Sequence, residues 1–202
     1  MKTKSALDSS VAREAPQREA QPLLNQRGKV IQPYGTLVHY PLSLSERARS
    51  TSVEALNQIL SDTVFLRDMY KKHHWQVSGA TFYQLHLLFD KFFEEQSTLV
   101  DLLAERVQTL GGIAIAMPND VAEMTKIEKP PRGREEVPVQ LSRLIEGLAV
   151  ILKSAHEAVK AAQANGDDGT VNLLSSDVIP TDELEVWFLS EHLVDTPLVR
   201  VK

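Results

Sequence analysis

The stretch KKHHWQVSGATFYQLHLLFDKFFEEQSTLVDLLAERV, from Lys71 to Val107, decides the fold, and it holds three of the chain's six histidines. Its apolar residues recur at helical spacing, which predicts a long helix over residues 81–110 that stops at Gly111 and Gly112. A preceding helix is expected to end at the SGA break, residues 78–80. Imidazole and carboxylate groups recur along the stretch, so they either face water or bind a ligand.

One polar stripe runs along the helix expected over residues 81–110. At about 100° per residue, His86, Asp90, Asp101 and Glu105 fall within one arc of about 100°. The apolar residues centre on a different face, which a bundle would bury. These residues are Leu85, Phe89, Phe92, Phe93, Leu99, Val100, Leu103, Val107 and Leu110. The polar stripe therefore points away from the helix's own core.

A solvated surface is the simplest interpretation of this stripe, because charged side chains usually cover the outside of a helix. Two spacings favour a bound cation instead. His86 and Asp90 are four residues apart, which is close enough to bind one ion together. Asp101 and Glu105 have the same spacing, at which unpaired like charges repel by about 0.2–0.5 kcal/mol. A cation between the two carboxylates would remove this repulsion.

The two pairs cannot meet on a single helix. Asp90 and Asp101 are separated by about 16 Å of helical rise, whereas metal ligands lie about 2.0–2.6 Å from their ion. The pairs can meet if the same helix of a second copy runs antiparallel across a two-fold axis. His74, at the end of the preceding helix, would then approach the His86 end. Two imidazoles and three carboxylates suit divalent iron, manganese, zinc or cobalt.

Four long helical segments are expected, over residues 45–77, 81–110, 135–164 and 170–193. Prolines and glycines interrupt the connection over residues 113–133, although NDVAEMTKI within it is expected to form a short helix. This order predicts an all-α four-helix bundle with a long crossover between the second and third helices. The fourth helix is expected to break near Pro180 and to restart with Thr181 as its cap.

Residues 1–44 are expected to form a flexible or extended N-terminal arm, residues 45–197 the bundle and residues 198–202 a short tail. The first 50 residues carry eight basic and four acidic groups, whereas the whole chain has a net charge of −5. The absence of cysteine excludes disulfides, thiolate metal sites and cysteine nucleophiles. Because no long apolar run and no apolar leader occur, we expect a cytoplasmic protein that does not contact the membrane.

The spacing His-x11-His-x3-Asp-x10-Asp-x3-Glu resembles that of the Dps family, the mini-ferritins also called DNA-binding proteins from starved cells. Here it consists of His74 followed by Trp75, then His86, Asp90, Asp101 and Glu105. The stretches GATFYQLHLLFDKF, AERVQTLGG, GDDGT and VWFLSEHLVDTP are also similar to family sequences. The resemblance covers residues 45–197 and is nearest to the cyanobacterial and haloarchaeal branch. No Glu-x-x-His pair occurs, which argues against the di-iron centre that other ferritins hold inside one bundle.

This resemblance implies a ferritin-like bundle that assembles into a dodecameric shell, with a ferroxidase centre at each two-fold interface. Such a centre oxidises Fe(II), with hydrogen peroxide as the expected oxidant and oxygen as the alternative. The ferric product is stored as mineral, which protects against oxidative damage. By matching position, His74, His86 and Asp90 would bind iron from one chain, and Asp101 and Glu105 from its partner. These five residues are the expected catalytic residues and iron ligands, and Trp75 would lie beside them.

The alternative function is a nucleoid-associated, DNA-binding structural protein with little ferroxidase activity. Its cationic contacts would come from the N-terminal arm, where the available groups are Lys2, Lys4, Arg13, Arg18, Arg27 and Lys29. Three acidic groups in the arm offset part of this charge, and the acidic body would repel the duplex. Twelve arms on one particle could still bind DNA through multivalency.

The other histidines and the C-terminal aromatic residues carry weaker signals. His73 is expected to face solvent at a helix end, and His39 stands alone in the arm. His156 and Glu157 fit either an ordinary surface or the wall of a pore, and His192 is expected to be structural or exposed. Trp187 and Phe188 are expected to be core or interface residues.

Overall fold

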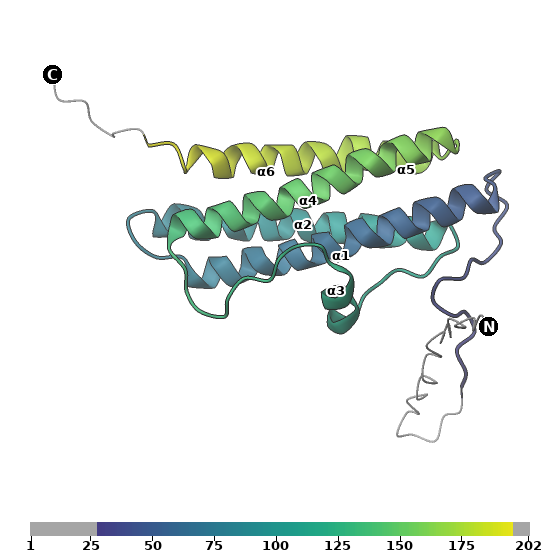
Figure 1. Ribbon diagram of the computed structural model, residues 1–202, viewed down its shortest axis with the longest axis horizontal. Helices are drawn as coiled ribbons and strands as arrows, with labels where there is room; N and C mark the ends of the chain where they lie inside the picture. The colour runs from purple at the N-terminus through teal and green to yellow at the C-terminus, as the bar shows by residue number, and fades with distance from the viewer. Residues whose placement is uncertain (1–27, 196–202) are drawn as a thin grey trace, which may run out of the picture. The chain divides into compact units, whose positions relative to one another are not determined.

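The computed structural model describes residues 28–195, within which every regular element is helical (Figure 1). The elements are α1 (Glu46–Gln76), α2 (Phe82–Thr109), α3 (Pro118–Met124), α4 (Val137–Ala164), α5 (Asp168–Leu173), a π-helix (Leu174–Val178) and α6 (Ile179–Glu191). Residues 1–27, which hold most of the expected arm, and the expected tail, residues 198–202, lie outside the described range. Residues 28–31 belong to a separate unit and are exposed.

The long helices form the predicted all-α four-helix bundle, with α3 carried on the crossover between α2 and α4. Helix α1 packs along both α2 and α4, and α4 packs along α6 (Figure 1). The short helix α3 contacts α1. In the range that the structure describes, no helix is long and apolar enough to span a bilayer.

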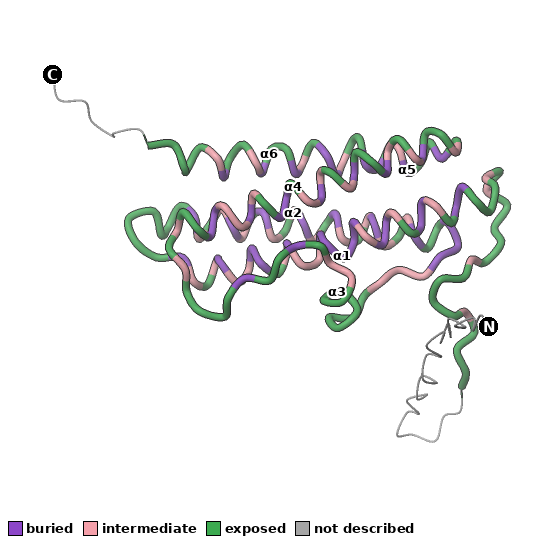
Figure 2. The backbone as a smooth tube through the Cα atoms, in the orientation of Figure 1, coloured by how far each residue is buried: buried purple, intermediate pink, exposed green. Residues whose placement is uncertain are grey.

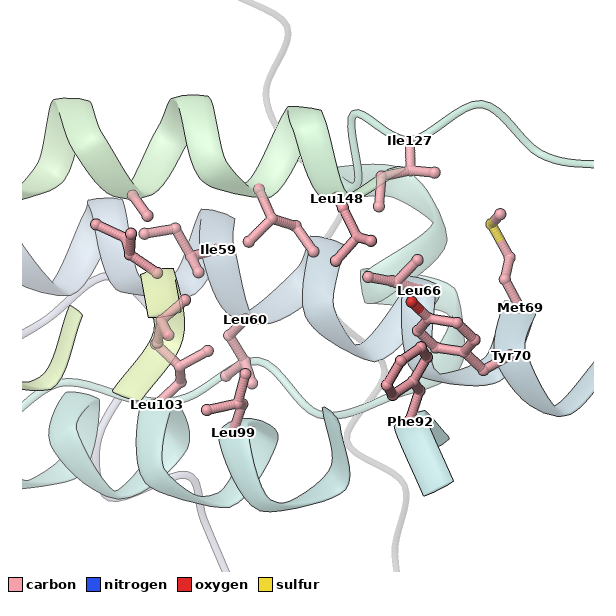
Figure 3. Close-up of a cluster of buried hydrophobic side chains, with 14 of the residues drawn as sticks. Ile59, Leu60, Leu66, Met69, Tyr70, Phe92, Leu99, Leu103, Ile127 and Leu148 are labelled. Carbon is pink, nitrogen blue, oxygen red and sulfur yellow. The ribbon is translucent and has the colours of Figure 1, made fainter. Parts of the chain in front are cut away.

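Buried apolar residues line the inner faces of these helices at helical spacing, with exposed residues between them (Figure 2). Leu66 and Tyr70 of α1 meet Phe92 of α2 in the core, and Leu148 of α4 lies nearby (Figure 3). The rings of Tyr70 and Phe92 meet edge to face, with their centroids 5.6 Å apart. Because the apolar faces of α1 and α2 are buried in this core, only their opposite faces remain available for a functional site.

Helix α1 begins where the sequence predicts it. The hydroxyl of Ser45 accepts a hydrogen bond from the backbone amide of Ala48 at 3.1 Å, and Glu46 lies in the first turn. The hydroxyl satisfies one otherwise unpaired amide, and the negative charge suits the positive end of the helix dipole. The start of α1 is therefore set by local chemistry alone.

Gly111 ends α2 in the left-handed region, with φ of 88°. Its carbonyl accepts a hydrogen bond from the backbone amide of Val38 at 2.8 Å and another from the side chain of Gln32 at 2.9 Å. The guanidinium of Arg49 donates to the carbonyls of Val38 and Leu110, at 2.7 and 3.1 Å. The segment that precedes α1 is thus fastened to the end of α2.

The fourth helix differs from its prediction, because Pro180 does not interrupt it. Instead, the chain passes from α5 through the π-helix into α6, and the amide of Ile179 donates to the carbonyl of Leu174, five residues back. This wider turn accommodates a proline ring that would clash with the preceding turn of a regular α-helix. Thr181 therefore lies inside α6 and caps nothing, and the side-chain cap is Asp167, which accepts from the amide of Thr170 at the start of α5.

Candidate metal centre

His74 near the end of α1 and His86 near the start of α2 form a stacked pair. Their ring centroids are 3.7 Å apart and the ring planes differ by 20°. The Nδ1 atom of His74 lies 2.7 Å from the backbone carbonyl of His86, and the Nδ1 atom of His86 lies 2.9 Å from that of His74. Each ring is therefore oriented by the backbone of the other helix.

These carbonyl contacts select one tautomer of each neutral ring. A carbonyl oxygen only accepts hydrogen bonds, so each Nδ1 must carry the proton in the neutral imidazole. Each Nε2 then presents a lone pair, which is the form that binds a divalent metal ion. Backbone or carboxylate partners of this kind orient metal-binding histidines and increase their basicity. In this tautomer, the Nε2 atoms are the ones that could hold a metal ion.

Asp90 lies one turn beyond His86 on α2 and brings a carboxylate to the pair. Its Oδ1 atom is 3.8 Å from Nδ1 of His74 and forms an ion pair with Lys71 of α1. The hydrogen bond from Lys71 is the main cause that lowers the pKa of Asp90, and both imidazoles act in the same direction. Asp90 is therefore ionised at neutral pH and is held by an ammonium group. Lys71 is a participant that the sequence analysis missed, although it precedes His74 by one helical turn.

Asp101 and Glu105 are exposed further along α2 and do not join this cluster. Across the described residues 28–195, no three histidine or acidic side chains come close enough together to hold a metal ion. Asp90 therefore lies beside the stacked His74–His86 pair without completing a three-ligand group, and Asp101 and Glu105 stay apart from it, exposed on α2.

Exposed apolar side chains flank the histidine pair. Trp75, which follows His74, is 69% exposed, and Phe82 places its ring 5.2 Å from that of His86. Tyr83 and Leu87 lie one turn apart on α2 and are also exposed. Large apolar groups gathered beside a polar cluster are typical of a surface that another chain covers.

His73 corrects the expectation of a solvent-facing side chain, because it is fully buried against Phe89. Burial is the main cause that lowers the pKa of His73 to about 4, and neither ring nitrogen has a hydrogen-bond partner. The ring is therefore neutral. Its position could have been found from spacing, because Leu66, Tyr70 and His73 follow one stripe of α1.

The remaining weak candidates lie on the surface. His39, His156, Glu157 and His192 are exposed. Trp187 is 58% exposed, so it is not a core residue of the subunit, and Phe188 is only partly covered, with one edge against Phe92. None of these residues adds a ligand to the histidine pair.

Three comparisons identify the family of this fold and its sequence. The Ferritin family, described as a ferritin-like domain, matches residues 53–199. The structure of DpsC from Streptomyces coelicolor is 53% identical, with a TM-score of 0.84, and the match covers 85% of this chain and 100% of that one.

Two relatives are named for DNA protection during starvation. The one from Halobacterium salinarum is 30% identical over 73% of this chain and 80% of its own length. The one from Deinococcus radiodurans, numbered 1, is 29% identical over 79% of this chain and 75% of its own length. The matches thus include the haloarchaeal relatives that the sequence resembles. The chain belongs to the Dps family of ferritin-like proteins.

Proposed function

We propose that this protein is a Dps-type ferroxidase that oxidises Fe(II) with hydrogen peroxide and stores the ferric product inside a dodecameric shell in the cytoplasm. One observation carries the proposal. His74 and His86 are oriented by crossed contacts between Nδ1 and backbone carbonyls, Asp90 lies beside them, and exposed apolar side chains flank the three residues. These three side chains would supply half of a donor set. The missing carboxylates stand on the same helix, where only a two-fold copy could bring them into place.

The proposed reaction balances with iron as the substrate. Two Fe(II) ions each give one electron to hydrogen peroxide, its O–O bond breaks, and two protons from solvent complete two molecules of water. In this scheme His74, His86 and Asp90 hold iron from one chain, while Asp101 and Glu105 hold it from the partner. Consuming peroxide and Fe(II) together in this way would limit oxidative damage.

Anaerobic loading tests the proposal directly. We expect the wild-type chain to bind Fe(II) at two equivalent sites per dimer and to oxidise it when peroxide is added, with particle mass measured on the same sample. A twelve-subunit mass is expected, because every site needs a partner. Absence of Fe(II) binding, or a monomer that binds iron at full affinity, would contradict the proposal.

Replacing Lys71 with methionine should tighten iron binding by about three- to fivefold. In the wild type, the Asp90 carboxylate must break its ion pair with Lys71 before it can bind the ion, and the variant lacks this competing interaction. Lys91→Met is the matched control. It removes the same charge one residue from Asp90, but Lys91 pairs with Glu95. Anaerobic calorimetry with Fe(II) checks the result. Equal affinities in the two variants would mean that Lys71 does not compete for Asp90.

The DNA-binding alternative is favoured by the names of the two relatives that protect DNA during starvation. Its cationic groups lie in residues 1–29, most of which are outside the described range. Salt-dependent retardation of DNA by the full chain, together with no peroxide-driven Fe(II) oxidation, would favour this alternative over the ferroxidase.

A further inference from the structure

A second polar cluster lies inside the bundle, where three helices meet. It consists of Tyr70 on α1, Gln96 on α2, and Asp182 and Glu185 on α6, and none of these residues is exposed to solvent. The hydroxyl of Tyr70 donates to Oε2 of Glu185 at 2.6 Å. The side-chain amide of Gln96 donates to Oδ1 of Asp182 at 2.7 Å and to Oε1 of Glu185 at 3.2 Å.

Acceptors outnumber donors in this cluster. Oδ2 of Asp182 and Oε1 of Gln96 are buried without a hydrogen-bond partner, as is Oε2 of the neighbouring Glu95. Leaving such atoms unpaired in the core costs about 1–3 kcal/mol each. Figure 3 shows Tyr70 among apolar side chains, including Leu66 and Phe92. The surroundings therefore offer little to satisfy the surplus oxygens.

Neither carboxyl group has a cationic partner among the described residues. The groups that face the pair are Tyr70 from α1 and Gln96 and Glu95 from α2. The buried residues of α4, which also packs on α6, are uncharged. Two carboxylates that share one amide donor would repel each other in this dry environment. A proton on either carboxyl both removes a charge and supplies a missing donor.

The surroundings favour the protonated form of both carboxyl groups, because they raise the pKa of each. Burial is the main cause that raises the pKa of Asp182 to about 7. Burial, followed by the charge of Asp182, raises the pKa of Glu185 to about 9. The pKa of Tyr70 is raised as well, chiefly by burial, so its hydroxyl remains a donor.

We propose that the Asp182–Glu185 pair retains at least one proton at neutral pH, and that this proton is required for α6 to seat firmly against α1 and α2. The cluster, which we call the clasp, is thus a pH-sensitive contact between α6 and the helices α1 and α2. It is independent of the iron chemistry proposed above, since none of its members belongs to the histidine site. Alkaline conditions remove the proton and loosen α6.

The sign of the pH dependence follows from the direction of the shifts. Unfolding returns the two carboxyls to ordinary pKa values of 3.8 and 4.5. Above those values the folded chain holds protons that the unfolded chain has released. The stabilisation is therefore complete below pH 3.8 and is lost as the pH rises through about 7 and about 9.

Infrared spectroscopy of the full, metal-free chain provides a direct test. Wild-type protein at neutral pH should show the C=O stretching band of a protonated carboxyl group, which the double variant Asp182→Asn, Glu185→Gln should lack. Glu183→Gln is the matched control, because Glu183 lies between the two residues on α6 but is exposed. This control should keep the band. Absence of the band from the folded wild-type chain would overturn the proposal, whether or not the double variant folds.

Amide hydrogen exchange of α6 tests the conformational part. After correction for the intrinsic rate, exchange in wild-type α6 should accelerate by about tenfold or more between neutral pH and about pH 9. One proton that only the closed state holds changes the opening equilibrium by about tenfold for each pH unit. Glu183→Gln should behave like the wild type, whereas Glu185→Gln should be nearly insensitive to pH. Parallel pH profiles in wild type and Glu185→Gln would overturn the proposed clasp.

Discussion

Shells that contain two inactive variants together should recover about one quarter of the wild-type ferroxidase sites. The first variant carries His74→Ala and His86→Ala, and the second carries Asp101→Ala and Glu105→Ala. Each variant alone should oxidise Fe(II) with peroxide at least about 100-fold more slowly than the wild type, because every site lacks half of its ligands. Recovery from two inactive chains is possible only if the halves come from different copies.

The fraction follows from two-fold symmetry. In a hybrid dimer, one site combines both damaged halves, and the other combines the intact imidazoles of one chain with the intact carboxylates of its partner. Random pairing makes about half of the dimers hybrid, and half of the sites in those dimers are complete. A site built within one subunit would give no recovery at any mixing ratio.

Stopped-flow oxidation of Fe(II) by peroxide measures this recovery on shells co-expressed with two different tags and purified through both. Mixing the two variants after assembly is the control, and it should show no recovery. Glu94→Ala removes an exposed carboxylate from α2 and should leave the rate unchanged. If hybrid dimers are present by native mass spectrometry but inactive, the shared-site arrangement is wrong.

Replacing Gly111 with alanine should destabilise the bundle more than any other glycine substitution at a helix end, by about 3 kcal/mol. Two costs combine at this position. The backbone has φ of 88°, which L-residues with a side chain rarely adopt, and an added Cβ atom would overlap the carbonyl oxygen of Val38. The contacts that fasten the segment before α1 would then have to shift.

A substitution at Gly166 measures the backbone strain alone. Gly166 follows α4 with φ of 72°, but an added Cβ atom would meet no other atom there. Gly166→Ala should therefore cost only the backbone strain, about 1 kcal/mol. Denaturant unfolding of both variants against wild type gives the two free energies. Equal losses would show that the contact with Val38 contributes nothing, and that the left-handed backbone accounts for the whole effect.

The bundle could be predicted from the sequence because its signals are local and periodic. Ser45 caps α1 and Gly111 ends α2, as the residue types indicate. The fourth helix was mispredicted at Pro180, because a π-turn is a response to packing that no propensity encodes. Packing around the fourth helix therefore overrides the tendency of a proline to interrupt it.

The buried polar residues were missed for a related reason. His73 was interpreted from its chemical type, and Gln96 and Asp182 were not singled out, although each of the three occupies a core position of its helix. Val178, Asp182, Glu185 and Leu189 share one stripe, as do Phe89, Phe92, Gln96, Leu99 and Leu103. Position would have indicated burial in every case. The five proposed iron ligands stay a prediction, since a site divided between two copies cannot be complete in one chain.

The crossed contacts between His74 and His86 have a practical consequence for protein engineering. Each imidazole is oriented by a backbone carbonyl of the opposite helix, so the connection between α1 and α2 sets the relative position of the two rings. Exposed loops such as residues 78–80 usually tolerate added sequence. Here a tag or grafted peptide would misalign both rings at once, although the loop itself is exposed.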